Sequence, residues 1–207
     1  MKLYEYEAFA NPRRVRIFAA EKGISLQREQ VDVPAGEHLQ AEHLGRNSYG
    51  AVPTLELDNG TYISESAAIC RYLDNLNIKG ANNATHLFGN TPQEQALVDM
   101  WDRRIESGLL NAVASYFHHG TEGLPSDEYQ NSDWGGYNRA QIQTHMKRLD
   151  DQLQASQYIA GNNFSMADIT LLCAIDFAAM FAISISEEHV ALQAWYELVN
   201  IRESVRA

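Results

Sequence analysis

Apolar and polar positions follow two different periods along this chain, and the change of period falls near residue 77. In the first part, short runs typical of strands alternate with runs that have helical spacing. The strands predicted there span 2–6, 26–33, 54–57 and 61–64, the helices span 12–22 and 64–76, and 38–45 is predicted to be a short helix or a turn. Later in the chain helical spacing predominates, and helices are predicted near 92–118, 135–154, 166–183 and 187–204. The sequence therefore predicts an α/β domain over 1–77, a polar linker over 78–91 and an all-α domain over 92–207.

Individual residues predict where some of these elements begin and end. Asn11 is a favoured N-cap and Pro12 suits the first helical position, so a helix is predicted to start there and to stop at Gly23. Asp-Asn-Gly at 58–60 separates two strand-like runs, which predicts a hairpin.

Composition and charge narrow the range of functions. The formal net charge of −11 argues against nucleic acid or anionic lipid as the main partner, because phosphate contacts need clustered Lys and Arg. No apolar run is long enough to span a membrane and no signal peptide is visible, so we expect a cytoplasmic protein. Cys70 and Cys173 lie far apart in apolar helical patterns, without metal-ligand spacing. We expect both to be buried thiols and expect no metal site.

The most specific segment for ligand binding is 50–73. Val52 is predicted to be extended because it precedes Pro53, and its free main-chain groups could pair with an extended peptide. Glu65 and Ser66 stand at a helix start, where exposed N–H groups and the helix dipole favour a carboxylate, and Glu65 could receive an ammonium group. These features suit one end of a small peptide; alternatively, Ser64–Ser66 only cap the helix and Pro53 only shapes a loop.

The run VPTLELDNGTYISESAAICRYLD at 52–74 resembles the cytosolic glutathione transferases, and the resemblance covers essentially the whole chain. It implies a thioredoxin-like first domain and a cis proline at Pro53. It also implies that Glu65 and Ser66 bind the γ-glutamyl end of glutathione, that the main chain of Val52 pairs with its cysteinyl part, and that His38 in GEHL contacts its glycyl carboxylate.

A second match to the same family lies at 158–178, YIAGNNFSMADITLLCAIDFA. Ser165 and Asp168 have capping-box spacing, with Ser165 as the N-cap and Asp168 reaching back to its N–H. The run resembles the folding signature of the transferases, so we interpret Asp168 as a structural residue.

The end of the long helix predicted near 92–118 offers candidate catalytic residues. Ser115 lies three residues before His118 and four before His119, so a hydroxyl and an imidazole can share a helix face. Alternatively, the histidines only cap the C-terminal end. The run resembles a fungal and bacterial branch of the transferases that lacks the usual catalytic Tyr, Ser or Cys, in which a Ser and a His hold a water that receives the thiol proton. The Ser of that branch aligns with Ala114, and a one-residue shift rotates a helical side chain by about 100°.

The turn AFANP at 8–12 would have to stabilise the thiolate of glutathione without a hydroxyl, since Phe9 occupies the position of the Ser in theta-like transferases. Three sources of stabilisation remain: the amide of Asn11, the N–H groups of the helix start, and the charges of Arg13 and Arg14. Asn11 could alternatively act only as an N-cap, and we expect the arginines to be mostly solvated or paired with acids.

The resemblance implies a homodimeric, cytoplasmic glutathione transferase that acts in detoxification. It would conjugate glutathione to a hydrophobic electrophile held near Phe9, Tyr116 and the loop 120–134. The alternatives are a glutathione-dependent peroxidase or disulfide reductase, which needs only the same thiolate, and a non-catalytic transferase-like binding module. A maleylacetoacetate isomerase is disfavoured because its branch carries Ser-Ser-Cys where this chain has Ala-Phe-Ala at 8–10.

Overall fold

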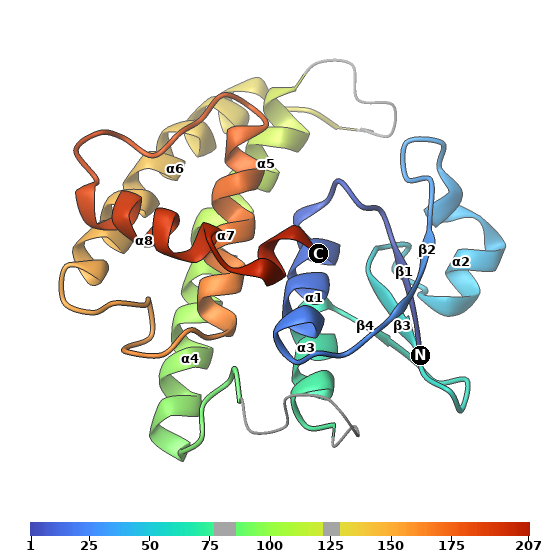
Figure 1. Cartoon of the computed structure of the whole chain (residues 1–207). Coiled ribbons are helices and arrows are strands. Elements are labelled where there is room, and N and C mark those ends of the chain that lie inside the picture. Colours follow the sequence, from blue (N-terminus) through green and yellow to red (C-terminus); the bar gives the residue numbers. More distant parts are fainter. Residues whose placement is uncertain (77–85, 122–128) are drawn as a thin grey trace. The chain divides into compact units, whose positions relative to one another are not determined.

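The computed structural model describes residues 1–76, 86–121 and 129–207, which divide into two compact units. The first unit comprises Met1–His86 with Arg206–Ala207, and the second comprises Leu87–Val205. The first is α/β and the second is helical, so the predicted fold class is confirmed (Figure 1). Most of the predicted linker, at 78–85, lies outside the described residues.

The first unit is built on a four-stranded sheet with the strand order β2-β1-β3-β4. The strands are β1 (Lys2–Glu5), β2 (Gln27–Gln30), β3 (Thr54–Glu56) and β4 (Tyr62–Ser64). β1 pairs in parallel with β2, whereas the β1–β3 and β3–β4 pairs are antiparallel. Gly60 adopts φ 81° in the turn between β3 and β4, which confirms the predicted hairpin. A βαβ unit followed by a hairpin and a helix is the thioredoxin-like arrangement.

Four helical segments complete the described part of the first unit. They are α1 (Ala10–Glu21), the 3₁₀ turn η1 (Glu37–Leu39), α2 (Ala41–Arg46) and α3 (Ser66–Asp74). In Figure 1, α1 and α3 lie beside each other on one side of the sheet and α2 lies on the other. Both faces of the small sheet are therefore covered within this unit.

Polar links at both ends fix α1 and α3 in parallel. Near their N-terminal ends, Nη1 of Arg14 donates to Oγ of Ser66 at 3.0 Å. Near their C-terminal ends, Nζ of Lys22 donates to the carbonyl of Asp74 at 3.3 Å and to its Oδ1 at 3.2 Å. The fully buried apolar residues of the two helices include Val15, Ile17, Phe18, Ile69 and Leu73. Both helices consequently begin at the same end of the unit.

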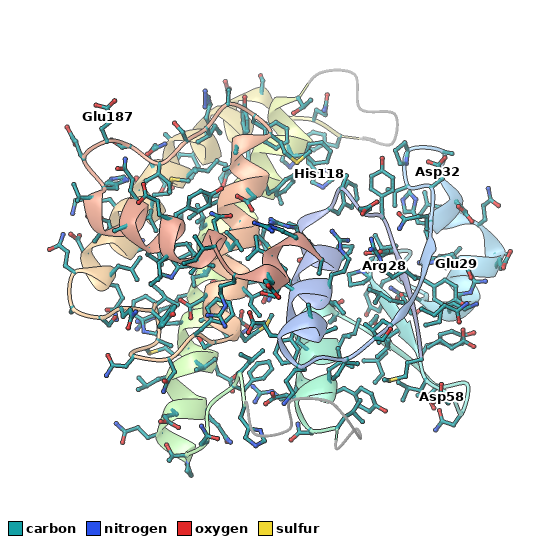
Figure 2. All side chains as sticks on the ribbon, in the orientation of Figure 1. Arg28, Glu29, Asp32, Asp58, His118 and Glu187 are labelled. Carbon is teal, nitrogen blue, oxygen red and sulfur yellow. The ribbon has the colours of Figure 1, made fainter. Side chains whose placement is uncertain are left out.

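A buried carboxylate connects β1, α1 and β2. Glu5 is fully buried, and its carboxylate binds Nη1 of Arg16 at 2.6 Å and the guanidinium of Arg28. Arg28 lies on β2 and is labelled in Figure 2. All four residues of β2 are exposed, so this strand is held by its ladder to β1 and by the pair to Glu5, more than by apolar burial.

The second unit is all-helical in its described part. Its helices are α4 (Pro92–Ile105), α5 (Asn111–Gly120), α6 (Ser132–Leu153), α7 (Met166–Ala179) and α8 (Val190–Asn200), with the 3₁₀ turn η3 (Glu203–Arg206) after them. One π-helical turn, η2 (Glu106–Leu110), joins α4 to α5, so the long predicted helix is nearly continuous. Helix α7 is the most buried of them, and Cys70 and Cys173 are both free, buried thiols as expected. No helix in the described ranges is both long and apolar enough to cross a membrane.

Asp168, in the first turn of α7, organises the core of the second unit. Its Oδ2 accepts from the N–H and hydroxyl of Ser165, at 2.9 and 2.8 Å. Its Oδ1 accepts from the N–H of Ile159 at 3.0 Å and from Nε1 of Trp195 at 2.9 Å. Complete burial raises the pKa of Asp168 to about 6, although these hydrogen bonds act to lower it. The carboxylate thus has the local structural role that its capping-box spacing predicts.

Candidate functional site

One end of the first unit collects most of the residues expected to bind ligand. The peptide bond between Val52 and Pro53 is cis, as the resemblance implies. Thr54 and Ser64 are register partners in the β3–β4 ladder, so Pro53 and Glu65 lie beside each other where that ladder ends. The loop before β3 and the start of α3 therefore belong to one site.

The loop before β3 is fixed by side chains that converge on one carbonyl. The carbonyl oxygen of Ala51 accepts from Nδ2 of Asn47 at 2.9 Å and from the Thr54 hydroxyl at 3.4 Å, and it lies 3.0 Å from Nε2 of His43. Within the described residues, neither main-chain group of Val52 has a hydrogen-bond partner. This short extended segment is therefore rigid and can pair with a strand-like ligand.

Glu65 begins α3 in a backbone conformation that residues with a side chain rarely adopt. Its φ is 69° and its ψ is 113°, and its exposed side chain makes no capping hydrogen bond to the helix. Such a conformation costs on the order of 1–3 kcal/mol and persists where the surroundings enforce it, often at binding sites. The carboxylate of Glu65 is thus held at the site and available to an ammonium group.

Arg14 orients two polar side chains of this end, and its burial contradicts the solvated state, one of the two alternatives that the sequence predicted for it. Its side chain is fully buried, and Nη1 donates to Oγ of Ser66 at 3.0 Å and to Oδ1 of Asn11 at 3.3 Å. Since Ser66 accepts this bond, its hydroxyl proton remains available to a ligand carboxylate. Since Oδ1 of Asn11 accepts as well, the N–H₂ group of that amide is directed away from Arg14 and can donate to a ligand.

The start of α1 differs from its prediction. The helix begins at Ala10, two residues early, and its N-cap is Phe9, whose side chain cannot accept a hydrogen bond. Asn11 is therefore not the N-cap; it lies in the first turn and is exposed. The half-buried ring of Phe9 packs edge-to-face on Tyr6, with 4.9 Å between the centroids. No side chain caps this helix start, so its positive end is available to an anion.

His38, which is predicted to contact the glycyl carboxylate of glutathione, lies in η1. Its side chain is half-buried, and its Nδ1 is buried without a hydrogen-bond partner within the described residues. A Cβ added to Gly50 would lie 3.3 Å from the carbonyl oxygen of His38, so η1 runs close to the loop that carries Val52. A histidine in this position can donate to a ligand that reaches the loop.

The candidate catalytic residues of the second unit lie on the last turns of α5. Ser115 and His119 are half-buried, and His118, which is labelled in Figure 2, is exposed. In the described part, no hydrogen bond joins the Ser115 hydroxyl to either imidazole. Nε2 of Gln130 donates to the carbonyls of His118 and Thr121, at 2.9 and 2.7 Å, and closes this helix end. Gln130, and not an imidazole, therefore satisfies these two carbonyls at the helix end.

Tyr116, the predicted second-substrate contact on α5, belongs to an aromatic cluster. Its ring lies edge-to-face on Phe181 at 5.7 Å, and Phe117 packs on Phe177 and Phe181 at 5.9 and 5.7 Å. A Cβ on Gly120 would lie 2.6 Å from the ring of Tyr116, so the helix end approaches this ring as closely as a glycine allows. Residues 122–128 of the predicted pocket loop lie outside the described residues.

These features define a class of protein in which a thioredoxin-like unit, whose two longer helices have uncapped starts, is followed by an all-helical unit. Two family descriptions match the chain: glutathione S-transferase, N-terminal domain, over 10–76, and glutathione S-transferase, C-terminal domain, over 133–203. Glutathione S-transferase 2 of Saccharomyces cerevisiae is 41% identical over 100% of this chain and 88% of its own length.

Two solved structures extend the comparison. The crystal structure of Gtt2 from Saccharomyces cerevisiae has a TM-score of 0.92 and 41% identity, covering 100% of this chain and 99% of its own. A glutathione S-transferase domain-containing protein from Marinobacter aquaeolei VT8 has a TM-score of 0.93 and 39% identity, covering 99% and 100%. The chain belongs to the glutathione S-transferase family, whose co-substrate is glutathione. The predictions of family, enzyme class and co-substrate are thereby confirmed.

Sequence reasoning missed the role of Arg14. Its spacing relative to Ile17 and Phe18, three and four residues later, places it on the buried face of α1, which was the available sign that it is not solvated. Its partner Ser66 is 52 residues away, so no local pattern could predict the hydrogen bond. Among the described residues, no group of three or more His, Cys, Asp or Glu side chains is arranged to hold a metal ion.

Proposed function

We propose that this protein binds glutathione at the end of the first unit where α1 and α3 begin, and conjugates its thiolate to hydrophobic electrophiles. The supporting observation is that these two parallel helices, neither capped by a side chain at its start, begin beside the free main chain of Val52. Glutathione carries a carboxylate, an ammonium group and an extended backbone at its γ-glutamyl end, and each has a complementary group there.

Each binding residue has a separate part in this proposal. Ser66 donates to the γ-glutamyl carboxylate and Glu65 accepts from the ammonium group. Val52, placed by Pro53, pairs with the cysteinyl backbone. His38 contacts the glycyl carboxylate. The net charge of −11 does not oppose this arrangement, because the anion contacts are local helix-start amides and hydroxyls.

The thiolate is stabilised where α1 begins. Anionic sulfur is the nucleophile, and each unit by which its pKa falls requires about 1.4 kcal/mol of preferential stabilisation. The amide of Asn11, turned outward by its bond to Arg14, and the dipole of α1 supply that stabilisation. The competing source is a water held by Ser115, His118 or His119 on α5, which is supported by their spacing and by the resemblance.

The electrophile is apolar in this proposal. Of its two predicted contacts, Phe9 packs on Tyr6 within the first unit, and Tyr116 belongs to the aromatic cluster of the second unit. The same thiolate could instead reduce a hydroperoxide or a disulfide, so turnover of a chlorinated aromatic should be compared with turnover of an organic hydroperoxide.

We further propose a cytoplasmic homodimer acting in detoxification, with the long helices of 92–118 and 135–154 as its interface.

Calorimetric titration with glutathione tests the binding site. Replacing Glu65 by Gln keeps the size of the side chain and removes the charge that meets the ammonium group, so affinity should fall about tenfold or more. Glu42→Gln is the matched control, because Glu42 is exposed on α2 and should leave affinity within about twofold. Unchanged affinity in Glu65→Gln would contradict the assignment.

A further inference from the structure

The second unit contains a pocket that the proposed function does not use. It has a volume of about 520 Å³ and lies between α6 and the segment that joins α7 to α8. Its polar and charged lining residues are Arg139, Gln143, Ser184, Ser186, Glu188 and His189. A volume of this size is ordinary for a small-molecule site.

Hydrogen bonds within the second unit hold the walls of this pocket in place. Ala182 adopts φ 54° at the end of α7, and the N–H of Ile183 bonds back to the carbonyl of Ala178 at 3.2 Å. Nε2 of Gln143 on α6 donates to the carbonyl of Ser184 at 3.0 Å. The carbonyl of Ser186 accepts from the N–H of His189 at 2.9 Å. The segment is thus tied to both α6 and α7, and the pocket is formed before any ligand arrives.

Two opposite charges of the lining are unneutralised. Arg139 comes from α6, and its guanidinium carbon lies 5.4 Å from the centroid of the Tyr116 ring. Glu188 comes from the α7–α8 segment. Within the described residues, neither side chain forms an ion pair. Opposite charges that share a pocket without pairing leave both available to one ligand.

His189 adds a polar group that the fold does not satisfy. The side chain is only 5% exposed, and its Nδ1 is buried without a hydrogen-bond partner in the described part of the chain. A buried N–H without a partner is rarer than an unpaired lone pair, so we expect the proton on Nε2. Because the ring lines the pocket and only Nδ1 is buried unsatisfied, Nε2–H is the donor that a ligand can meet.

We propose that this pocket binds a small zwitterion of the amino acid or short-peptide class. The carboxylate of the ligand pairs with Arg139 and accepts from Nε2–H of His189, and its ammonium group pairs with Glu188. A simple anion would be attracted by Arg139 but repelled by the carboxylate of Glu188, and a simple cation would be attracted by Glu188 but repelled by Arg139. Only a molecule with both charges therefore complements both walls. The site lies wholly in the second unit and does not depend on the glutathione proposal.

Nuclear magnetic resonance of the full chain tests this proposal, with glycylglycine as the probe. The ring signals of His189, assigned by comparison with His189→Gln, should shift saturably, with a dissociation constant on the order of 1 mM. N-acetylglycylglycine lacks the ammonium group and glycylglycine amide lacks the carboxylate, so each should bind at least about fivefold more weakly. A missing shift at His189, or equal binding of the three probes, would overturn the proposal.

Matched variants locate the two charges. Arg139→Gln and Glu188→Gln should each weaken glycylglycine binding at least about fivefold. The controls are Arg148→Gln, on the same helix outside the pocket, and Glu187→Gln, the exposed neighbour labelled in Figure 2, and both should bind as the unaltered protein does. Pocket variants that bind as tightly as their controls would overturn the assignment, as would glycylglycine shifts confined to signals of the first unit.

Discussion

Three helices of the second unit, α4, α6 and α7, begin with side-chain caps, which the two longer helices of the first unit lack; α8 begins at His189 without one. In the second unit, Thr91 and Glu94 bond reciprocally at the start of α4, at 3.1 and 3.2 Å. Oδ1 of Asn131 accepts from the N–H of Trp134 at α6, at 3.0 Å, and Asp168 closes the start of α7. Side-chain caps of this kind stabilise a helix by about 0.5–2 kcal/mol each.

The first unit forgoes this stabilisation at both of its longer helices. Phe9 cannot cap α1, and Glu65 does not cap α3 even though it has a suitable carboxylate. An uncapped helix start keeps its N–H groups and positive dipole end for a ligand. The contrast teaches that the same local motif, an acidic residue at a helix start, is structural where its acceptors are used internally, and that its acceptors stay free for the proposed ligand where they are not.

The largest expected effect on stability comes from removing the side-chain cap at the start of α7. Asp168→Ala removes the acceptor of four hydrogen bonds and leaves the N–H groups of Ile159 and Trp195 buried without partners. The free energy of unfolding should fall by about 3 kcal/mol or more, measured by urea denaturation. Asp151→Ala is the control, because its carboxylate is exposed at the end of α6, and it should change stability by less than about 0.5 kcal/mol. Similar losses in both variants would remove the contrast between buried and exposed acids.

The same carboxylate predicts a pH dependence. Burial raises the pKa of Asp168 from 3.8 to about 6, so between these values the folded state holds a proton that the unfolded state has lost. Stability should therefore fall as pH rises through this window, by up to about 3 kcal/mol relative to Asp168→Asn, and stay constant above it. Urea denaturation of both proteins from pH 4 to about 7 measures the difference. A constant difference would mean that the hydrogen bonds outweigh burial and keep the acid charged throughout.

A smaller effect separates function from stability at the open start of α3. Glycine adopts the positive φ of Glu65 without a steric cost, whereas alanine does not. Glu65→Gly should therefore be more stable than Glu65→Ala by about 1 kcal/mol in thermal or urea unfolding, while both lose affinity for glutathione. If the two variants unfold alike, the backbone of Glu65 is not strained. If either keeps its affinity, the carboxylate does not bind the ammonium group.

Local patterns predicted the starts of α4 and α7 at the right residue, whereas α6 begins at Ser132, three residues before the predicted 135, and α1 and α3 each begin two residues from their predicted starts. The hydrogen bond between Ser165 and Asp168 joins residues only three positions apart, and the hairpin turn lies within 58–60. Both features could therefore be predicted from the spacing of residues along the chain. The start of α1 could not, because Asn11 resembles an N-cap but gives its Oδ1 to Arg14 one turn later. The end of α7 was predicted too late, since Ala182 terminates it with a positive φ that sequence rules assign to glycine or asparagine.

The candidate site shows the same division. Glu65, Ser66 and Pro53 could be predicted because one hairpin brings them together, and the order of the chain already contains that hairpin. The burial of Arg14 and the orientation that it gives to Ser66 depend on a contact between α1 and α3. Contacts of such long range depend on packing, which a single sequence does not encode locally.

The most direct test of the account is the pKa of the glutathione thiol when it is bound to this protein. It is measured by the ultraviolet absorbance of the thiolate as a function of pH, for the unaltered protein and for Asn11→Ala, His118→Ala and His119→Ala. The open start of α1 should hold this pKa at least about one unit below the value near 8.5 of a free thiol, and Asn11→Ala should raise it. A bound thiol that titrates like the free one, or a pKa that moves only in the histidine variants, would contradict the account.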